Sequence, residues 1–251
     1  MLLRAAVVVV AATVIVLLVT TRRTDDAEHT SCTRLAVPAY VEPAELVRAG
    51  DDEATTVVIL NPADGPDVER DEELVPAVRA VRGDGVLVLG YVATGYGAIS
   101  VDEVVAQARR YERWYGVDGI FLDEVSSEAA DLAHYDGMTA SLRADGMSTV
   151  AINPGVYPDR GYLDVADLVV TFEGTAQEYL ELERPAEIGA FAGEWHLVHT
   201  ASRREALDAV ALAARRGVPY FYATDRAGAG DTWNALPPWF AAQSEAALAT
   251  C

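Results

Sequence analysis

Eight short apolar segments alternate with helix-like segments along most of this chain, and this alternation constrains the fold more than any other feature. Short, continuously apolar runs are typical of parallel strands that are covered on both faces. Eight such strands close a (β/α)8 barrel of the TIM type, and 251 residues is a usual length for one. We therefore predict an α/β fold with a single barrel. Its strands are expected at residues 35–40, 56–60, 86–91, 120–123, 149–153, 168–173, 196–200 and 220–223.

An open, doubly wound sheet is the alternative arrangement of alternating strands and helices. Dinucleotide-binding sheets of that kind carry a glycine-rich loop that opens a helix. The glycine-containing segment 90–97 lacks the required spacing and is not followed directly by a helix. The barrel is therefore favoured, and no cofactor is expected.

The segments between the strands have helical periodicity or helix-capping signals. The clearest helix begins after Ser202, with Glu205 three residues later as a capping box. A break is expected near Gly137 in the helix of residues 129–144. The helices are expected at residues 44–49, 71–82, 102–115, 129–144, near 162, 176–182, 203–216 and 241–249.

The N-terminal residues have the composition of a targeting segment. Residues 1–23 contain an apolar run, residues 5–19, flanked by arginines, and they are expected to be a signal peptide or a membrane anchor. No small-x-small cleavage site follows directly, so both alternatives stay open. Residues 24–31 are expected to be a linker, and residues 32–251 the barrel domain. Either alternative predicts a secreted or extracellular protein, with possible membrane attachment.

The formal net charge of −20 limits the partners of the chain. Nucleic acid is excluded as a ligand class, because binding it needs a basic surface. A neutral or cationic substrate is favoured. The oligomeric state is left open.

The two cysteines lie at the two ends of the expected barrel. Cys32 precedes the first strand and Cys251 is the last residue. Because a closed barrel brings its first and last elements together, a Cys32–Cys251 disulfide is geometrically reasonable in an oxidising compartment.

Acidic and amide side chains follow three neighbouring strands. Asp123 and Glu124 end the apolar run that begins at Gly119, Asn153 ends the next strand, and Glu173 ends the one after it. A barrel places its active site at this end of its strands. Period-two alternation predicts that Asp123 and Phe121 face the barrel interior. It predicts the same of Glu173, Thr171 and Val169, while Glu124 lies over the mouth. For a single acid, a helix N-cap is the competing interpretation.

Further polar and aromatic residues are expected around the same mouth. Aromatic rings stack on the apolar faces of pyranoses, and carboxylates and amides bind the hydroxyls. The expected substrate-binding residues are Tyr40, Asn61, Tyr91, Asn153, His199, Tyr222 and Asp225.

Two carboxyl groups across a cleft are the minimal apparatus of a glycosidase. One must be protonated to assist the leaving oxygen, and the other must be ionised. A catalytic metal is not expected, because His196 and His199, three positions apart on a strand, point to opposite faces.

The order of these motifs resembles the spherulation-specific (spherulin-four-like) family. The resemblance implies a (β/α)8 glycoside hydrolase that cuts galactosamine-containing exopolysaccharide, with Asp123, Glu124 and Glu173 as its essential acids. It covers most of the domain and rests on the segments 37–43, 61–62, 90–92, 119–124, 153–155, 171–173, 196–199 and 220–225.

The expected function is hydrolysis of an extracellular polysaccharide that contains galactosamine or N-acetylgalactosamine. Glu173 would be the general acid/base. Asp123 would be the nucleophile or would orient a substrate acetamido group, with Glu124 in support. The alternative is a barrel that binds glycan without cutting it, as a surface or spore-associated structural protein. A metal-dependent phosphodiesterase is the third interpretation, and it lacks the expected histidine cluster.

Overall fold

The computed structural model describes residues 32–227 and 232–251, which form a closed barrel of eight parallel strands. The expected signal or anchor segment and the linker, residues 1–31, lie outside the described residues. The strands pair in chain order, and the first strand also pairs with the last, through Arg34 with Tyr220 and Leu35 with Phe221. They are β1 (Arg34–Ala39), β2 (Thr55–Leu60), β3 (Leu87–Ala93), β4 (Gly119–Asp123), β5 (Thr149–Ile152), β6 (Leu168–Thr175), β7 (Glu194–His199) and β8 (Tyr220–Ala223).

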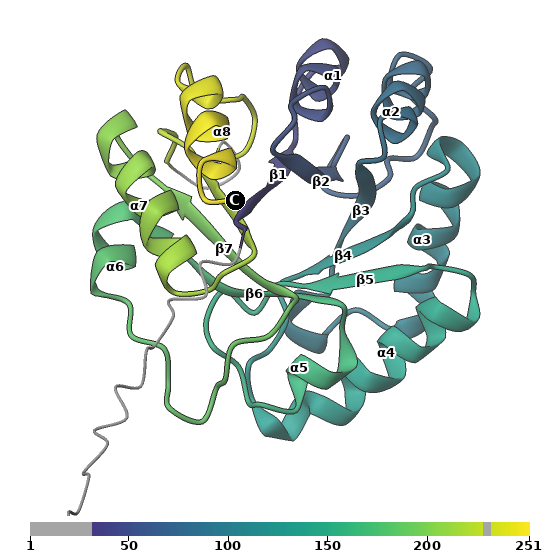
Figure 1. Cartoon of the computed structure of the whole chain (residues 1–251). Coiled ribbons are helices and arrows are strands. Elements are labelled where there is room, and N and C mark those ends of the chain that lie inside the picture. Colours follow the sequence, from purple (N-terminus) through teal and green to yellow (C-terminus); the bar gives the residue numbers. More distant parts are fainter. Residues whose placement is uncertain (1–31, 228–231) are drawn as a thin grey trace, which may run out of the picture.

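The helices stand around the outside of the strands and cover the barrel (Figure 1). Among the described residues, no helix is both long enough and apolar enough to span a bilayer. The α-helices are α1 (Pro43–Gly50), α2 (Leu74–Gly83), α3 (Val101–Tyr115), α4 (Leu132–Ala144), α5 (Tyr162–Val165), α6 (Ala176–Glu181), α7 (Arg203–Arg215) and α8 (Phe240–Leu248), and the 3-10 turns are η1 (Gly95–Gly97) and η2 (Ala129–Asp131).

Most of the predicted elements are confirmed, and the differences have local causes. The capping box of Ser202 and Glu205 opens α7 as predicted. Helix α2 begins three residues later than expected, because the Asp71 carboxylate accepts from the Glu73 amide at 2.8 Å and makes a turn there. The predicted break at Gly137 is wrong. Helix α4 is continuous through this exposed glycine, which lowers helix stability without ending the helix.

Aromatic side chains fill the barrel interior below the strand ends. The ring of Phe121 stacks on Tyr91 at 6.3 Å and meets Trp195 edge to face at 5.6 Å. Outside the barrel, Gly90 lets Tyr111 of α3 pack against β3, since a Cβ atom at Gly90 would lie 2.5 Å from that ring. A packed interior gives the strand ends a rigid base, which a catalytic site requires.

The two ends of the domain are joined covalently. Cys32 and Cys251 form a disulfide, with their Cα atoms 4.6 Å apart. Beside it, the amide of Thr33 donates to the Thr250 hydroxyl at 2.9 Å. Figure 1 shows α8, in yellow, near the purple strand β1. The bond closes a loop with a sequence separation of 219 residues, which includes the whole barrel.

Removing this cross-link is expected to lower the free energy of unfolding by about 2–4 kcal/mol, because the unfolded chain regains the entropy of a very long loop. Urea denaturation of the parent, with and without reductant, and of the Cys32→Ala/Cys251→Ala variant measures the change. An unchanged midpoint, or two free thiols found by mass mapping of the oxidised protein, would contradict the assignment.

Candidate active site

A cleft of about 510 Å³ opens at the carboxyl ends of the strands, within the range of small-ligand sites. Its walls come from most of the strands and from the C-terminal tail. Its lining residues are Tyr40, Asn61, Asp64, Tyr91, Phe121, Asp123, Asn153, Glu173, Leu197, His199, Thr232 and Trp233.

Three side chains from consecutive strands meet in this cleft and are joined by hydrogen bonds. The Nδ2 atom of Asn153 donates to Asp123 Oδ1 at 2.8 Å and to Glu173 Oε2 at 2.6 Å. Since both oxygens accept from one nitrogen, they lie no more than about 5.4 Å apart, the two distances taken together. The structure thus brings together the acids that the sequence separates by 50 positions.

The backbone fixes the position of each member of this group. Asp123 is the last residue of β4. The backbone amide of Asn153 donates to the Leu122 carbonyl at 2.8 Å, which extends the pairing of β4 with β5 by one residue. The Glu173 amide donates at 2.8 Å to the carbonyl of Gly155 in the loop after β5. Glu173 also pairs with Leu197 of β7, so strand pairing helps to place all three side chains and positions the site more accurately than a free loop would.

Burial raises the pKa values of both carboxyl groups. It raises the pKa of Glu173 from 4.5 to about 7, against the opposing hydrogen bond from Asn153 and with a further rise from the nearby Asp123 charge. Burial also raises the pKa of Asp123, but hydrogen bonds from the Glu124 backbone, Tyr91 and Asn153 oppose it. Glu173 can therefore hold a proton near neutral pH, while the three hydrogen bonds to Asp123 favour the ionised form of that carboxyl group.

The second polar atom of the Asn153 side chain, Oδ1, is a buried acceptor. Of the two polar atoms of the Asn153 side chain, only Nδ2 can donate to the carboxylates, so the amide is oriented with Oδ1 facing away from them. That oxygen is buried and has no hydrogen-bond partner among the described residues. A buried acceptor without a partner is unfavourable.

Glu124 lies at the rim, as the alternation predicted. Its side chain is exposed, and its backbone is left-handed with φ of 53°. The Glu124 carbonyl accepts from the Thr94 hydroxyl at 2.7 Å and from the Tyr96 amide at 2.7 Å. This turn directs the chain away from the strand axis immediately after Asp123, so the two acids point to different parts of the mouth.

The structure divides the remaining expected sugar-binding residues into two groups. Tyr40, Asn61, Tyr91 and His199 line the cleft with the acids. Tyr222 and Asp225 do not, and for Tyr222 the prediction is wrong. Its ring is 1% exposed and packs on Trp233 and Phe240, at 6.0 and 6.4 Å, in the core beside α8. Asp225 is exposed beyond the end of β8, outside the cleft lining.

Trp233 is a cleft residue that strand alternation could not predict, because it comes from the tail after the last strand. The Tyr40 amide donates to the Trp233 carbonyl at 3.2 Å, which brings the tail across the mouth of the barrel beside β1. The sequence showed only that an aromatic residue occurs in the tail after the last strand. It did not indicate where in the fold this side chain would lie.

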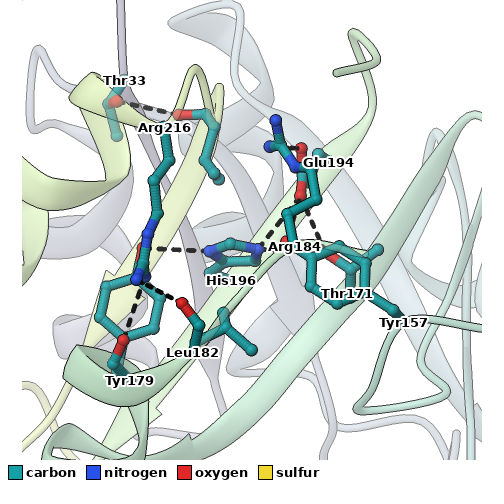
Figure 2. Close-up of polar contacts among 10 residues, drawn as sticks. Thr33, Tyr157, Thr171, Tyr179, Leu182, Arg184, Glu194, His196 and Arg216 are labelled. Carbon is teal, nitrogen blue, oxygen red and sulfur yellow. Dashed lines mark hydrogen bonds and ion pairs between the residues drawn. The ribbon is translucent and has the colours of Figure 1, made fainter. Parts of the chain in front are cut away.

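A buried polar network joins side chains of β6, β7 and α6 (Figure 2). Its centre is Glu194, which is fully buried. The Glu194 carboxylate forms an ion pair with Arg184 and accepts from the Tyr157 and Thr171 hydroxyls at 3.0 and 3.3 Å. The network therefore connects the loop after β5 and the middle of β6 to β7. These segments flank the part of β6 that carries Glu173.

Thr171 belongs to this network, and the prediction that it faces the barrel interior is wrong. The pairing of β6 with β7 is irregular between Val170 and Phe172, so one residue of β6 is additional. The Thr171 hydroxyl lies 3.1 Å from His196 Nε2, on the side where Phe172 packs against Tyr179. The bulge interrupts the alternation before Glu173, which still reaches the cleft.

The two histidines of β7 face opposite sides, as predicted. His199 lines the cleft, whereas His196 is fully buried in the network. Burial lowers the pKa of His196, so the ring is neutral. With Nε2 as donor toward Thr171 and Glu194, Nδ1 accepts from the Tyr179 hydroxyl at 3.0 Å. Within residues 32–227 and 232–251, no three His, Cys, Asp or Glu side chains are grouped as ligands for a metal ion.

Comparisons with known proteins agree on both the sequence motifs and the barrel. The model of spherulation-specific family 4 matches residues 34–247. Spherulin-4 of Physarum polycephalum is 28% identical over 232 residues, which cover 85% of this chain and 69% of that protein.

Two solved structures share the fold at low sequence identity. Sph3 of Aspergillus clavatus, in complex with GalNAc, superposes with a TM-score of 0.69 at 23% identity, covering 87% of this chain and 98% of that one. A fungal endo-β-N-acetylglucosaminidase of glycosyl hydrolase family 18 gives a TM-score of 0.53 at 15% identity, with 86% and 96% covered.

Proposed function

The chain belongs to spherulation-specific family 4, and on that premise we propose that it is a glycoside hydrolase acting on an extracellular polysaccharide that contains N-acetylgalactosamine or galactosamine. The observation that carries the proposal is the pair of carboxyl groups, Asp123 and Glu173, bridged by Asn153 inside a cleft. The GalNAc bound to the Aspergillus clavatus relative supports the choice of sugar.

Glu173 is the proposed general acid. Because burial raises its pKa to about 7, it holds a proton near neutral pH. It gives that proton to the glycosidic oxygen as the bond from this oxygen to the anomeric carbon breaks. Asp123 stabilises the positive charge that develops on the sugar. It either attacks the anomeric carbon itself or orients an acetamido group whose oxygen attacks. Water then releases the sugar, with Glu173 accepting the proton as general base.

The separation of the two carboxyl groups favours retention of anomeric configuration. Inverting enzymes need about 6.5–9.5 Å between carboxyl groups so that a water molecule fits beside the sugar, whereas retaining enzymes have about 5–5.5 Å. Because both acids accept from the Asn153 nitrogen, their bonded oxygens lie at most about 5.4 Å apart, the sum of the two hydrogen-bond distances, and this agrees with the shorter range. Both proposed roles of Asp123 give retention, since each includes two displacements at the anomeric carbon.

The aromatic surroundings of the acids suit a sugar substrate. Tyr40, Tyr91 and Trp233 provide rings in the same cleft for the apolar faces of pyranoses. Glu124, at the rim, is proposed to assist one of the other acids through its charge.

Export from the cytoplasm belongs to the same proposal. Residues 1–23 have the composition of a signal peptide or anchor, and a disulfide persists in oxidising compartments. A polymer outside the cell is then the available substrate.

The proposal is tested by a hydrolysis screen over polysaccharides that include galactosamine and N-acetylgalactosamine polymers, run on the parent and on Glu173→Gln. New reducing ends from the parent alone are expected. Binding without new reducing ends would instead support the glycan-binding barrel. Loss of activity in EDTA would support a metal-dependent hydrolase.

The pH dependence of kcat/KM is expected to be bell-shaped, with its alkaline limb near pH 7, where Glu173 loses its proton. The acid limb reports protonation of the pair at Asp123, above the ordinary pKa of an aspartate. Asn153 lowers the pKa of both carboxyl groups, so Asn153→Leu is expected to move both limbs to higher pH. A profile from this variant that overlies the parental one would contradict the assignment.

A further inference from the structure

A second cleft, of about 460 Å³, extends from the acids toward the loops after β3 and β5. It shares Asp123, Asn153, Glu173 and His199 with the first cleft, so the acids lie where the two meet. Its other lining residues are Tyr96, Glu124, Pro154, Gly155 and Val156.

Apolar groups are unusually exposed in the second cleft. Tyr96 is 69% exposed and Val156 is 53% exposed, and both are among the few large apolar side chains that the described surface leaves open. No described residue forms a side-chain hydrogen bond or ring contact with Tyr96. Neighbouring exposed apolar groups beside a polar cleft mark a binding surface more often than isolated ones do.

The backbone of Tyr96 is held in a conformation that disfavours a bulky residue. Its φ is 54°, and the flanking Gly95 and Gly97 are also left-handed. Glycine adopts this conformation without penalty, whereas tyrosine does not. Hydrogen bonds hold the turn, including that from the Tyr96 amide to the Glu124 carbonyl. Unfavourable backbone conformations persist at ligand-binding positions, where they aim a side chain.

We infer that Tyr96 and Val156 form the floor of a second sugar subsite, which binds the pyranose on the far side of the cleaved bond. The inference rests on the proposed hydrolase function and extends it. The Tyr96 ring offers a face to the apolar side of a sugar, and its hydroxyl offers a hydrogen bond. The Glu124 carboxylate, exposed beside it, accepts from a sugar hydroxyl or binds a sugar amine.

The geometry gives the two clefts different roles. The first cleft is enclosed by buried aromatic residues such as Phe121 and Tyr91, whereas the second is bordered by exposed loop residues. With the acids at the junction, a polymer occupies both clefts, and a short substrate whose leaving group is not a sugar needs only the first. Tyr96 should therefore matter for polymer and not for such a substrate.

The test is the substitution Tyr96→Gly, with Tyr96→Phe to keep the ring and Leu180→Ala as a control at an exposed apolar residue of α6. Affinity for a galactosamine-containing polymer is measured in the Glu173→Gln background, and KM and kcat in the active background. We expect Tyr96→Gly to weaken polymer binding and raise the polymer KM about tenfold, as loss of one stacked ring does. Tyr96→Phe keeps the ring and loses only the hydroxyl, so it should weaken binding less than Tyr96→Gly does, and Leu180→Ala should remain near the parent.

Thermal unfolding separates this role from a structural one. Because glycine suits a φ of 54°, Tyr96→Gly should unfold at the parental temperature or above it. Unchanged polymer affinity, or a loss matched by a lower unfolding temperature, would overturn the subsite. Polymer binding that needs Tyr96 without any hydrolysis would overturn the proposed hydrolase and leave the subsite supported. Polymer hydrolysis that is independent of Tyr96 would overturn the subsite and leave the proposed hydrolase supported.

Discussion

Replacing Glu173 by glutamine is expected to abolish most hydrolysis, with kcat lower by about 10²–10⁴-fold, because the leaving oxygen then departs without a proton. Glutamine preserves the shape of the side chain, and its carbonyl can still accept from Asn153. The measurement is the rate of reducing-end formation at the pH optimum. Glu181→Gln, an exposed residue at the end of α6, is the matched control and should keep parental activity.

The same substitution is expected to stabilise the protein at high pH. The pKa of Glu173 is raised from 4.5 to about 7 in the folded protein. Its contribution to stability is therefore fully present below pH 4.5 and is lost as the pH rises through about 7. Above pH 7, Glu173→Gln should be more stable than the parent by up to about 3 kcal/mol, and below pH 4.5 the two should be similar.

Urea denaturation of parent and variant at pH 4 and pH 8 measures this difference. Equal stabilities at pH 8 would contradict the buried, proton-holding environment assigned to Glu173. An inactive variant with lower stability at both values would show that activity was lost through misfolding instead.

Glu194→Ala is expected to lower the free energy of unfolding by about 3 kcal/mol or more, because it leaves the Arg184 charge and the hydroxyls of Tyr157 and Thr171 without their partner. The kcat value should fall as well, since the network holds the β6 bulge and the β5 loop on either side of Glu173. Denaturation midpoints and kcat at one pH measure the two effects.

Two further variants show which part of the Glu194 contribution is electrostatic. Glu194→Gln keeps an acceptor for Tyr157 and Thr171 but loses the charge, so an intermediate loss is expected. Glu187→Ala, an exposed acid in the preceding loop, should leave stability unchanged. A Glu194→Ala variant as stable as the parent would contradict the role of this network.

Much of the barrel was predictable, because each strand is a continuous apolar run between turn residues and each run also has to be buried. The inward face of β4 followed from alternation, since β4 is regular from Gly119 to Asp123. Alternation failed at Thr171, where an additional residue in β6 has no sequence signal of its own.

The parts of the site that depend on long-range packing could not be predicted from the sequence. Tyr222 looks like other rim aromatics, but α8 and Trp233 cover it. Asn153 was expected as a substrate contact, and nothing in the pattern indicated that it bridges both acids. Tyr96 lies between two glycines, and this context predicts a turn but not an exposed ring beside a cleft.

The most direct test of the bridged acid pair is the proton NMR spectrum of the first sugar released from a GalNAc- or galactosamine-containing polymer. The close approach of Asp123 and Glu173 predicts that new reducing ends appear first in the anomeric configuration of the substrate, and that Glu173→Gln yields none. First appearance of the opposite anomer, or an equal signal from Glu173→Gln, would contradict the account.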